Sequence, residues 1–162
     1  MGTRGSFGFY YKGKYYMVYN HFDSYNLYHD LITEIMIAIT NGTFQSWICK
    51  VENIQCVTRN RVPTEEEIKK LSKYSDLSVS SGSPKEWYCL LRKCQGSYEK
   101  ILDAGYIENF VNDDGELIHE EYTCVLNFDD NTFESYDHGS NKKIEKIDDL
   151  VKKYGKQNSL TL

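Results

Sequence analysis

The densest cluster of polar side chains in this sequence is the stretch NHFDS at residues 20–24, which follows an aromatic run near the N-terminus. On an extended segment His21 and Asp23 project to one side of the chain. A histidine beside a carboxylate can transfer protons, and with His29 as a third member these side chains could bind a metal ion. The alternative is a strand end whose Asp and Ser side chains form a turn. The absence of an activated nucleophile beside the pair favours this structural alternative.

A second group of candidate residues lies on the segment that begins at Trp87. At helical spacing Tyr88, Arg92 and Gln95 fall on one stripe, beside the apolar stripe of the same helix. Arg92 could bind a carboxylate or phosphate there, or it could form a structural ion pair with an acid such as Asp76. Structural pairing is the commoner role for such a residue outside a cleft.

The N-terminus carries two short signals. Met1 and Gly2 with Ser6 match the pattern for N-myristoylation of Gly2. A single myristoyl chain binds membranes only marginally, and Ser6 also begins a predicted strand. An early strand is reminiscent of hydrolases with an N-terminal nucleophile, but removal of Met1 would expose Gly2, which has no nucleophilic side chain.

Composition indicates one ordinary globular domain of 162 residues, with 27% charged residues and an unusual 14 tyrosines. The net charge of −5 argues against direct nucleic-acid binding, because contact with phosphates requires a basic surface. The five cysteines are odd in number and form no CxxC pair, so we expect reduced thiols in a protein that is not secreted. No apolar run approaches the ~20 residues of a transmembrane segment. The sequence also shows no metal-ligand set, phosphate-binding loop or other cofactor motif, so we expect neither a metal nor a cofactor.

Two β-hairpins frame the predicted architecture. Aromatic and β-branched runs at 6–11 and 15–20, joined by a short glycine turn, predict the first hairpin. Runs at 122–128 and 132–136 predict the second. Gly8 lies opposite Phe7 and Phe9 across the first strand, where a neighbour could approach the backbone closely.

Apolar periodicity and cap residues predict the helices and a strand between and after these hairpins. These elements are helices at 27–40, 44–51, 64–74, 84–95 and 97–104, a strand at 106–111, and a last helix at 143–154 with Ile144 facing inward. The order predicts a single α+β domain, an antiparallel sheet packed with several helices, over residues 1–155, with a C-terminal tail at 156–162.

Several stretches of the chain resemble an uncharacterised family of small proteins from large DNA viruses of amoebae, such as marseillevirus-type viruses, and from fungi. They read MGTRG at 1–5, YNHFDSY at 19–25, SSGS at 80–83, WYCLLRKCQG at 87–96 and VLNFD at 125–129. The resemblance implies a protein of the virion or of the host cytoplasm, with no established reaction. The chain departs from the family pattern after residue 25, where relatives have a Pro/Gly-rich loop, and at Glu121-Tyr122, where they have Glu-Trp.

Two functional hypotheses follow. The first is a non-enzymatic structural or interaction protein that associates with itself or with a protein partner through an aromatic surface, because tyrosines are abundant and a catalytic set is absent. The alternative is a hydrolase or small-ligand-binding domain with a pocket between the N-terminal hairpin and the Trp87 helix. Such a pocket would use Arg4, His21, Asp23 and Arg92, and it would be recognised by the convergence of these four residues.

Overall fold

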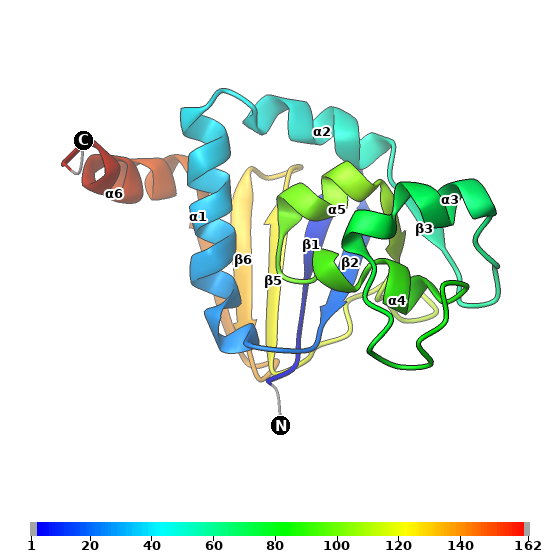
Figure 1. Ribbon diagram of the computed structural model, residues 1–162. Helices are drawn as coiled ribbons and strands as arrows, with labels where there is room; N and C mark the ends of the chain where they lie inside the picture. Colours follow the sequence, from blue (N-terminus) through cyan, green and yellow to red (C-terminus); the bar gives the residue numbers. More distant parts are fainter. Residues whose placement is uncertain (1–2, 161–162) are drawn as a thin grey trace.

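The protein is described by a computed structural model that covers residues 3–160, with side chains described for residues 3–155. Its centre is a five-stranded sheet in the order β2-β1-β5-β6-β7 (Figure 1). Neighbouring strands pair antiparallel except β1 and β5, which are parallel. The strands are β1 (Gly5–Tyr11), β2 (Lys14–Asn20), β5 (Tyr122–Asn127), β6 (Thr132–Asp137) and β7 (Asn141–Lys146).

One face of this sheet is covered by α1 (Leu27–Thr40), α2 (Phe44–Glu52) and α5 (Tyr98–Ala104), as Figure 1 shows. A small parallel sheet of β3 (Gln55–Val57) and β4 (Tyr106–Glu108) lies beside β2. The remaining elements are η1 (Ser24–Asn26), α3 (Glu65–Lys70), η2 (Ser72–Tyr74), α4 (Trp87–Leu90), η3 (Arg92–Cys94) and α6 (Ile147–Leu160). The predicted α+β class and single domain are therefore confirmed.

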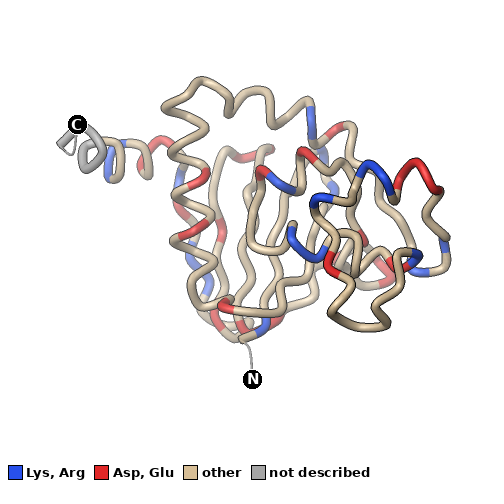
Figure 2. Tube along the Cα trace, viewed as in Figure 1, with Lys and Arg blue, Asp and Glu red and all other residues tan. Residues whose placement is uncertain are grey.

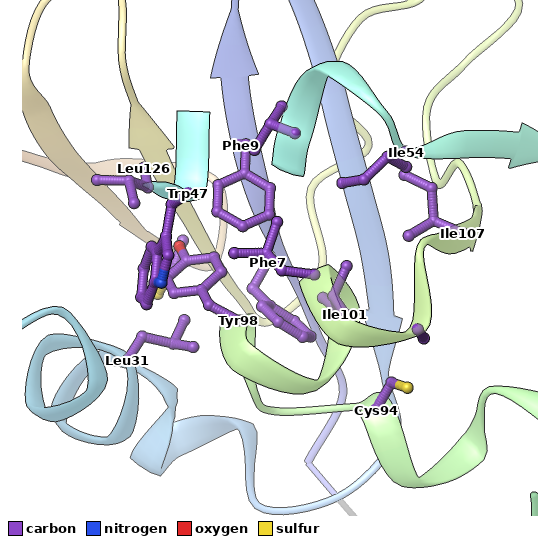
Figure 3. Packing of buried hydrophobic residues seen from close by; sticks show 14 of the residues in the cluster. Phe7, Phe9, Leu31, Trp47, Ile54, Cys94, Tyr98, Ile101, Ile107 and Leu126 are labelled. Carbon is purple, nitrogen blue, oxygen red and sulfur yellow. The ribbon is translucent and has the colours of Figure 1, made fainter. Parts of the chain in front are cut away.

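The core centres on aromatic side chains of β1 and the helices above it (Figure 3). Phe7 and Phe9 are fully buried, with ring centroids 5.7 and 4.7 Å from that of Tyr98 on α5. Trp47 on α2 packs against the same tyrosine at 5.8 Å. The Tyr98 hydroxyl donates a buried hydrogen bond of 3.1 Å to the carbonyl of Gly8, so α5 is held by both packing and a polar contact.

Gly8 allows the first hairpin to close. A Cβ atom at this position would lie 1.9 Å from the Tyr16 carbonyl oxygen and 2.8 Å from the Met17 Cα of the paired strand. Both neighbours are backbone atoms, which cannot move aside without breaking the β1–β2 ladder. The predicted close approach at Gly8 is thus confirmed, and the approaching group is the backbone of β2.

The predicted helix at 143–154 is wrong in its first part, and it continues to Leu160, through residues predicted to belong to a C-terminal tail. Residues 141–146 form β7, which pairs antiparallel with β6, and α6 begins only at Ile147. Ile144 is 53% exposed rather than inward-facing, whereas Ile147 and Leu150 are buried. The open edge of β6 supplies a ladder of backbone hydrogen bonds that local helix propensity does not reveal.

The predicted helix at 84–95 is interrupted. Only Trp87–Leu90 is α-helical, and η3 follows after Leu91. The Ser83 hydroxyl accepts from the Lys85 N–H at 3.1 Å, and the Glu86 carboxylate is held by Ser80 and Ser81. The Ser83 and Glu86 side chains therefore stabilise a loop that precedes the helix. The sequence also predicts an antiparallel sheet. That prediction is wrong for one pair of strands, because β1 and β5 are parallel.

Acidic and basic residues are interspersed along the described chain, as Figure 2 shows. Among residues 3–160 no helix combines the length and the apolar character needed to cross a bilayer. The helix predicted from residue 64 begins with a capping box: the Glu67 carboxylate accepts from the Thr64 N–H, and the Thr64 hydroxyl accepts from the Glu67 N–H. Arg61 adds a bidentate pair to Glu67 at 2.9 and 3.1 Å.

We expect Gly8→Ala to lower the free energy of unfolding by at least about 3 kcal/mol, because the added methyl group overlaps backbone atoms of β2. Urea unfolding measured by circular dichroism tests this. Gly155→Ala in α6 is the control, since among the described side chains its Cβ would meet Val151 Cγ1 at 3.9 Å, an ordinary contact distance, and helix propensity predicts a gain of about 0.5–1 kcal/mol. Equal stability of Gly8→Ala and the parent protein would contradict the packing described for β1 and β2.

Glu67→Gln should lower stability at pH 7 by about 1–2 kcal/mol, because the amide cannot replace the charged pair with Arg61. That pair lowers the Glu67 pKa from 4.5 to about 2. The stabilisation is therefore complete above pH 4.5 and is lost as the pH falls from 4.5 towards 2. Unfolding free energies measured between pH 2 and 7 should converge for the two proteins at the acidic end, whereas the exposed neighbour variant Glu66→Gln should follow the parent.

Candidate functional site

The predicted site residues do not all converge. His21 and Arg92 line one cleft beside β2, while Asp23 and Arg4 are exposed and do not line it. His29 is exposed on α1. Gly2, the predicted lipidation site, lies outside the described residues.

Two adjoining pockets between β2, β4 and the α4–η3 segment form the cleft, and we call them the inner and the outer chamber. Their volumes are about 450 Å3 and about 850 Å3, respectively. The two chambers share five lining residues, which we call the neck: Tyr19, Arg59, Trp87, Tyr88 and Glu108. The cleft therefore lies where the alternative hypothesis expected it, between the N-terminal hairpin and the Trp87 segment.

Aliphatic and aromatic side chains dominate the inner chamber. They include Val18, Leu91, Cys94, Ile101, Ile107 and Phe110. At the neck the Trp87 indole stacks on Tyr106, with centroids 5.3 Å apart, and its N–H donates to the Arg61 carbonyl at 2.7 Å. Because these contacts fix the indole plane, the inner chamber offers a preformed apolar surface.

The strand end at residues 20–24 forms a turn, and His21 and Phe22 of this turn line the cleft. The Asn20 side-chain amide donates to the Phe22 carbonyl at 2.7 Å and to Ser24 Oγ at 2.8 Å, which shapes the turn. The His21 N–H donates to Gln95 Oε1 at 2.9 Å, so the turn is fastened to the end of η3. Asp23 adopts a left-handed conformation with φ of 56°. The two readings of this stretch are thus compatible.

The partner of His21 is Tyr19. The Tyr19 hydroxyl and His21 Nδ1 are 3.0 Å apart, whereas no hydrogen bond joins His21 and Asp23 among the described side chains. In a neutral imidazole whose Nδ1 accepts the tyrosine hydrogen, Nε2 carries the proton. His21 can then donate a hydrogen bond from Nε2 to an acceptor.

Arg92 forms no ion pair within 4.0 Å with an acidic residue of the described chain. Its guanidinium carbon lies 5.5 Å from the centre of the Phe22 ring, and its Nε is buried without a hydrogen-bond partner among the described residues. The predicted pair with Asp76 does not form, because the Asp76 carboxylate accepts from the Ser78 N–H and hydroxyl instead. A short local turn satisfies Asp76 without a distant arginine.

Two carboxylates, those of Glu86 and Glu108, line the cleft, and their pKa values are shifted in opposite directions. Hydrogen bonds from Ser81 and Ser80 lower the pKa of Glu86. Burial raises the pKa of Glu108, Glu86 raises it further, and Arg59 opposes the shift. Within the described chain, no group forms a hydrogen bond, or an ion pair within 4.0 Å, with the carboxylate of Glu108. Glu86 is thus a structural residue of the 80–86 loop, and Glu108 is a carboxylate without a partner.

Sequence reasoning missed three residues of the neck, namely Tyr19, Arg59 and Glu108. Glu108 carried a signal, because it is the one charged residue in the strand predicted at 106–111. Tyr19 carried a weaker one, since it lies two residues before His21 and therefore on the same side of an extended chain.

Comparisons with protein-family models, with curated proteins and with solved structures find no match. Within the described side chains no group of three or more His, Cys, Asp and Glu residues is arranged to hold a metal ion. Inferences about function therefore rest on the geometry of the cleft.

Cysteine labelling tests the inner wall of the cleft. Burial raises the pKa of the Cys94 and Cys124 thiols to about 12, whereas Cys49 is exposed. Because the thiolate is the reactive form, native protein treated with iodoacetamide at pH 8 should be modified at Cys49 and spared at Cys94 and Cys124. Peptide mass spectrometry reads the sites, and denatured protein labelled at all five cysteines is the control. Rapid native labelling of Cys94 would contradict this packing.

Proposed function

We propose that this protein binds a small amphipathic anion in the cleft beside β2. The observation that carries the proposal is the convergence of His21 and Arg92 on a cleft whose inner end is apolar. An anionic group would bind to Arg92 and to His21 Nε2, while the apolar part of the ligand would enter the inner chamber past Trp87.

Electrostatics and packing support this assignment. Arg92 forms no ion pair with the described residues, so its interaction with a ligand anion would not require an existing pair to break. Phe22 supports the guanidinium from one side, which limits its conformational freedom. Charge-assisted hydrogen bonds to carboxylate or phosphate are the stronger class of polar contact.

The hypothesis of a protein-interaction component stays a prediction with less support. It depended on an aromatic surface, but the largest aromatic side chains, such as Trp47, Trp87 and Tyr98, are buried in the core. Among the described aromatic residues, Phe22 and Tyr25 are the ones exposed above half. The resemblance to proteins of large DNA viruses is the basis for proposing that the protein works in the virion or the host cytoplasm.

Calorimetric titration with indole-3-propionate, an aromatic carboxylate, tests the proposal. We expect Arg92→Gln to weaken binding about 10- to 100-fold, because it removes the charge-assisted contact. Lys93→Gln is the matched control: it removes the same charge from the adjacent residue of η3, which does not line the cleft. Lys93→Gln should bind like the parent.

Two outcomes would overturn the proposal. One is the absence of measurable binding of indole-3-propionate to the folded parent protein. The other is equal weakening in Arg92→Gln and Lys93→Gln, which would indicate attraction by net charge rather than by this cleft.

A further inference from the structure

Glu108 occupies a distinct place in the cleft, at the end of β4 and in the neck between the two chambers. The anion-binding residues His21 and Arg92 line only the outer chamber. A ligand that occupies both chambers and reaches Arg92 would therefore lie across the boundary that Glu108 lines.

The carboxylate of Glu108 has no partner in the described chain, unlike the other acidic side chain of the cleft. Glu86 accepts from Ser80 Oγ at 2.7 Å and from the Ser81 hydroxyl. Glu108 has neither hydrogen bond nor ion pair, although its surroundings are partly desolvated. A partly buried carboxylate without a partner is costly, and a cationic or hydrogen-bond-donating group of a ligand would relieve that cost.

Arg59 does not remove this requirement. It lines the neck, is exposed to solvent, and forms no ion pair within 4.0 Å with a described acidic residue. Its positive charge adds to that of Arg92 and favours an anionic group in the outer chamber. The cleft thus combines an apolar inner chamber, a carboxylate at the neck and cationic side chains in the outer chamber.

We infer that the ligand is an amino-acid-like zwitterion with a large apolar side chain, whose amine binds Glu108 and whose carboxylate binds Arg92. This inference rests on the proposed function and specifies its ligand class. The apolar side chain would occupy the inner chamber, which is large enough at about 450 Å3 to enclose an aromatic or branched group. Because each charged group of the ligand meets an unpaired opposite charge, a zwitterion is favoured over a simple anion or a simple cation.

Three matched ligands test the inference by calorimetry. L-Tryptophan carries both charges, indole-3-propionate lacks the amine, and tryptamine lacks the carboxylate. We expect the parent protein to bind tryptophan about 10-fold more tightly than indole-3-propionate, as one charge-assisted contact predicts. Glu108→Gln should remove that preference and leave the affinity for indole-3-propionate unchanged or improved. Glu99→Gln, at an exposed position of α5, should preserve the preference.

The failure of this inference can be distinguished from the failure of the proposed function. If indole-3-propionate binds in an Arg92-dependent manner but tryptophan binds no more tightly, the cleft binds anions and the zwitterion inference is overturned. Equal weakening of both ligands by Glu108→Gln would also overturn it. If no indole carboxylate binds, both proposals fail. The comparison of the three ligands on the parent protein is decisive even if Glu108→Gln does not fold, and thermal unfolding checks the variant.

Discussion

The buried hydrogen bond from the Tyr98 hydroxyl to the Gly8 carbonyl is the contact on which the rest of the structure depends. It joins the start of α5 to the middle of the interior strand β1, between Phe7 and Phe9. Glu34 of α1 fixes the same end of α5, because its carboxylate accepts from the Ser97 hydroxyl and the Tyr98 N–H at 2.6 and 2.7 Å. Helix α5 is therefore held by the sheet and by the longest covering helix at once.

The geometry of the cleft depends on these contacts that fix α5. The segments directly before and after α5 are η3, which carries Arg92, and β4, which carries Glu108. A shift of α5 would displace both walls of the cleft relative to β2. The contact of Gln95 with the His21 N–H then aligns the strand end with η3, so the charged groups are positioned by a rigid scaffold rather than by a free loop.

Local patterns predicted much of the fold. The helix at 27–40, both hairpins and the capped start of α3 agree with the structure, because each depends on contacts between residues close in the chain. Residues 141–146 and the parallel β1–β5 pair could not be predicted in this way, since their hydrogen-bond partners are supplied by other strands.

The candidate site shows the same limit. His21 and Arg92 were found because their residue types suggest chemistry. Glu108 and Arg59 were missed because a charged residue becomes functional here only through the distant segments that surround it. Nor did the sequence show that Tyr19, rather than Asp23, would pair with His21: the left-handed turn at Asp23 interrupts the extended conformation on which that expectation relied.

The parallel pairing of β1 with β5 has a consequence for synthesis of the chain. The paired residues Ser6 and Thr123 are 117 positions apart, although β1 lies in the interior of the sheet. At about 5–20 residues per second, a ribosome needs roughly 10 s to extend the chain from one strand to the other. During that interval the edge of β1 that later pairs with β5 is unpaired, a state that favours intermolecular pairing. The nascent N-terminal hairpin is therefore a predicted client for chaperones that shield exposed strands until the C-terminal quarter emerges.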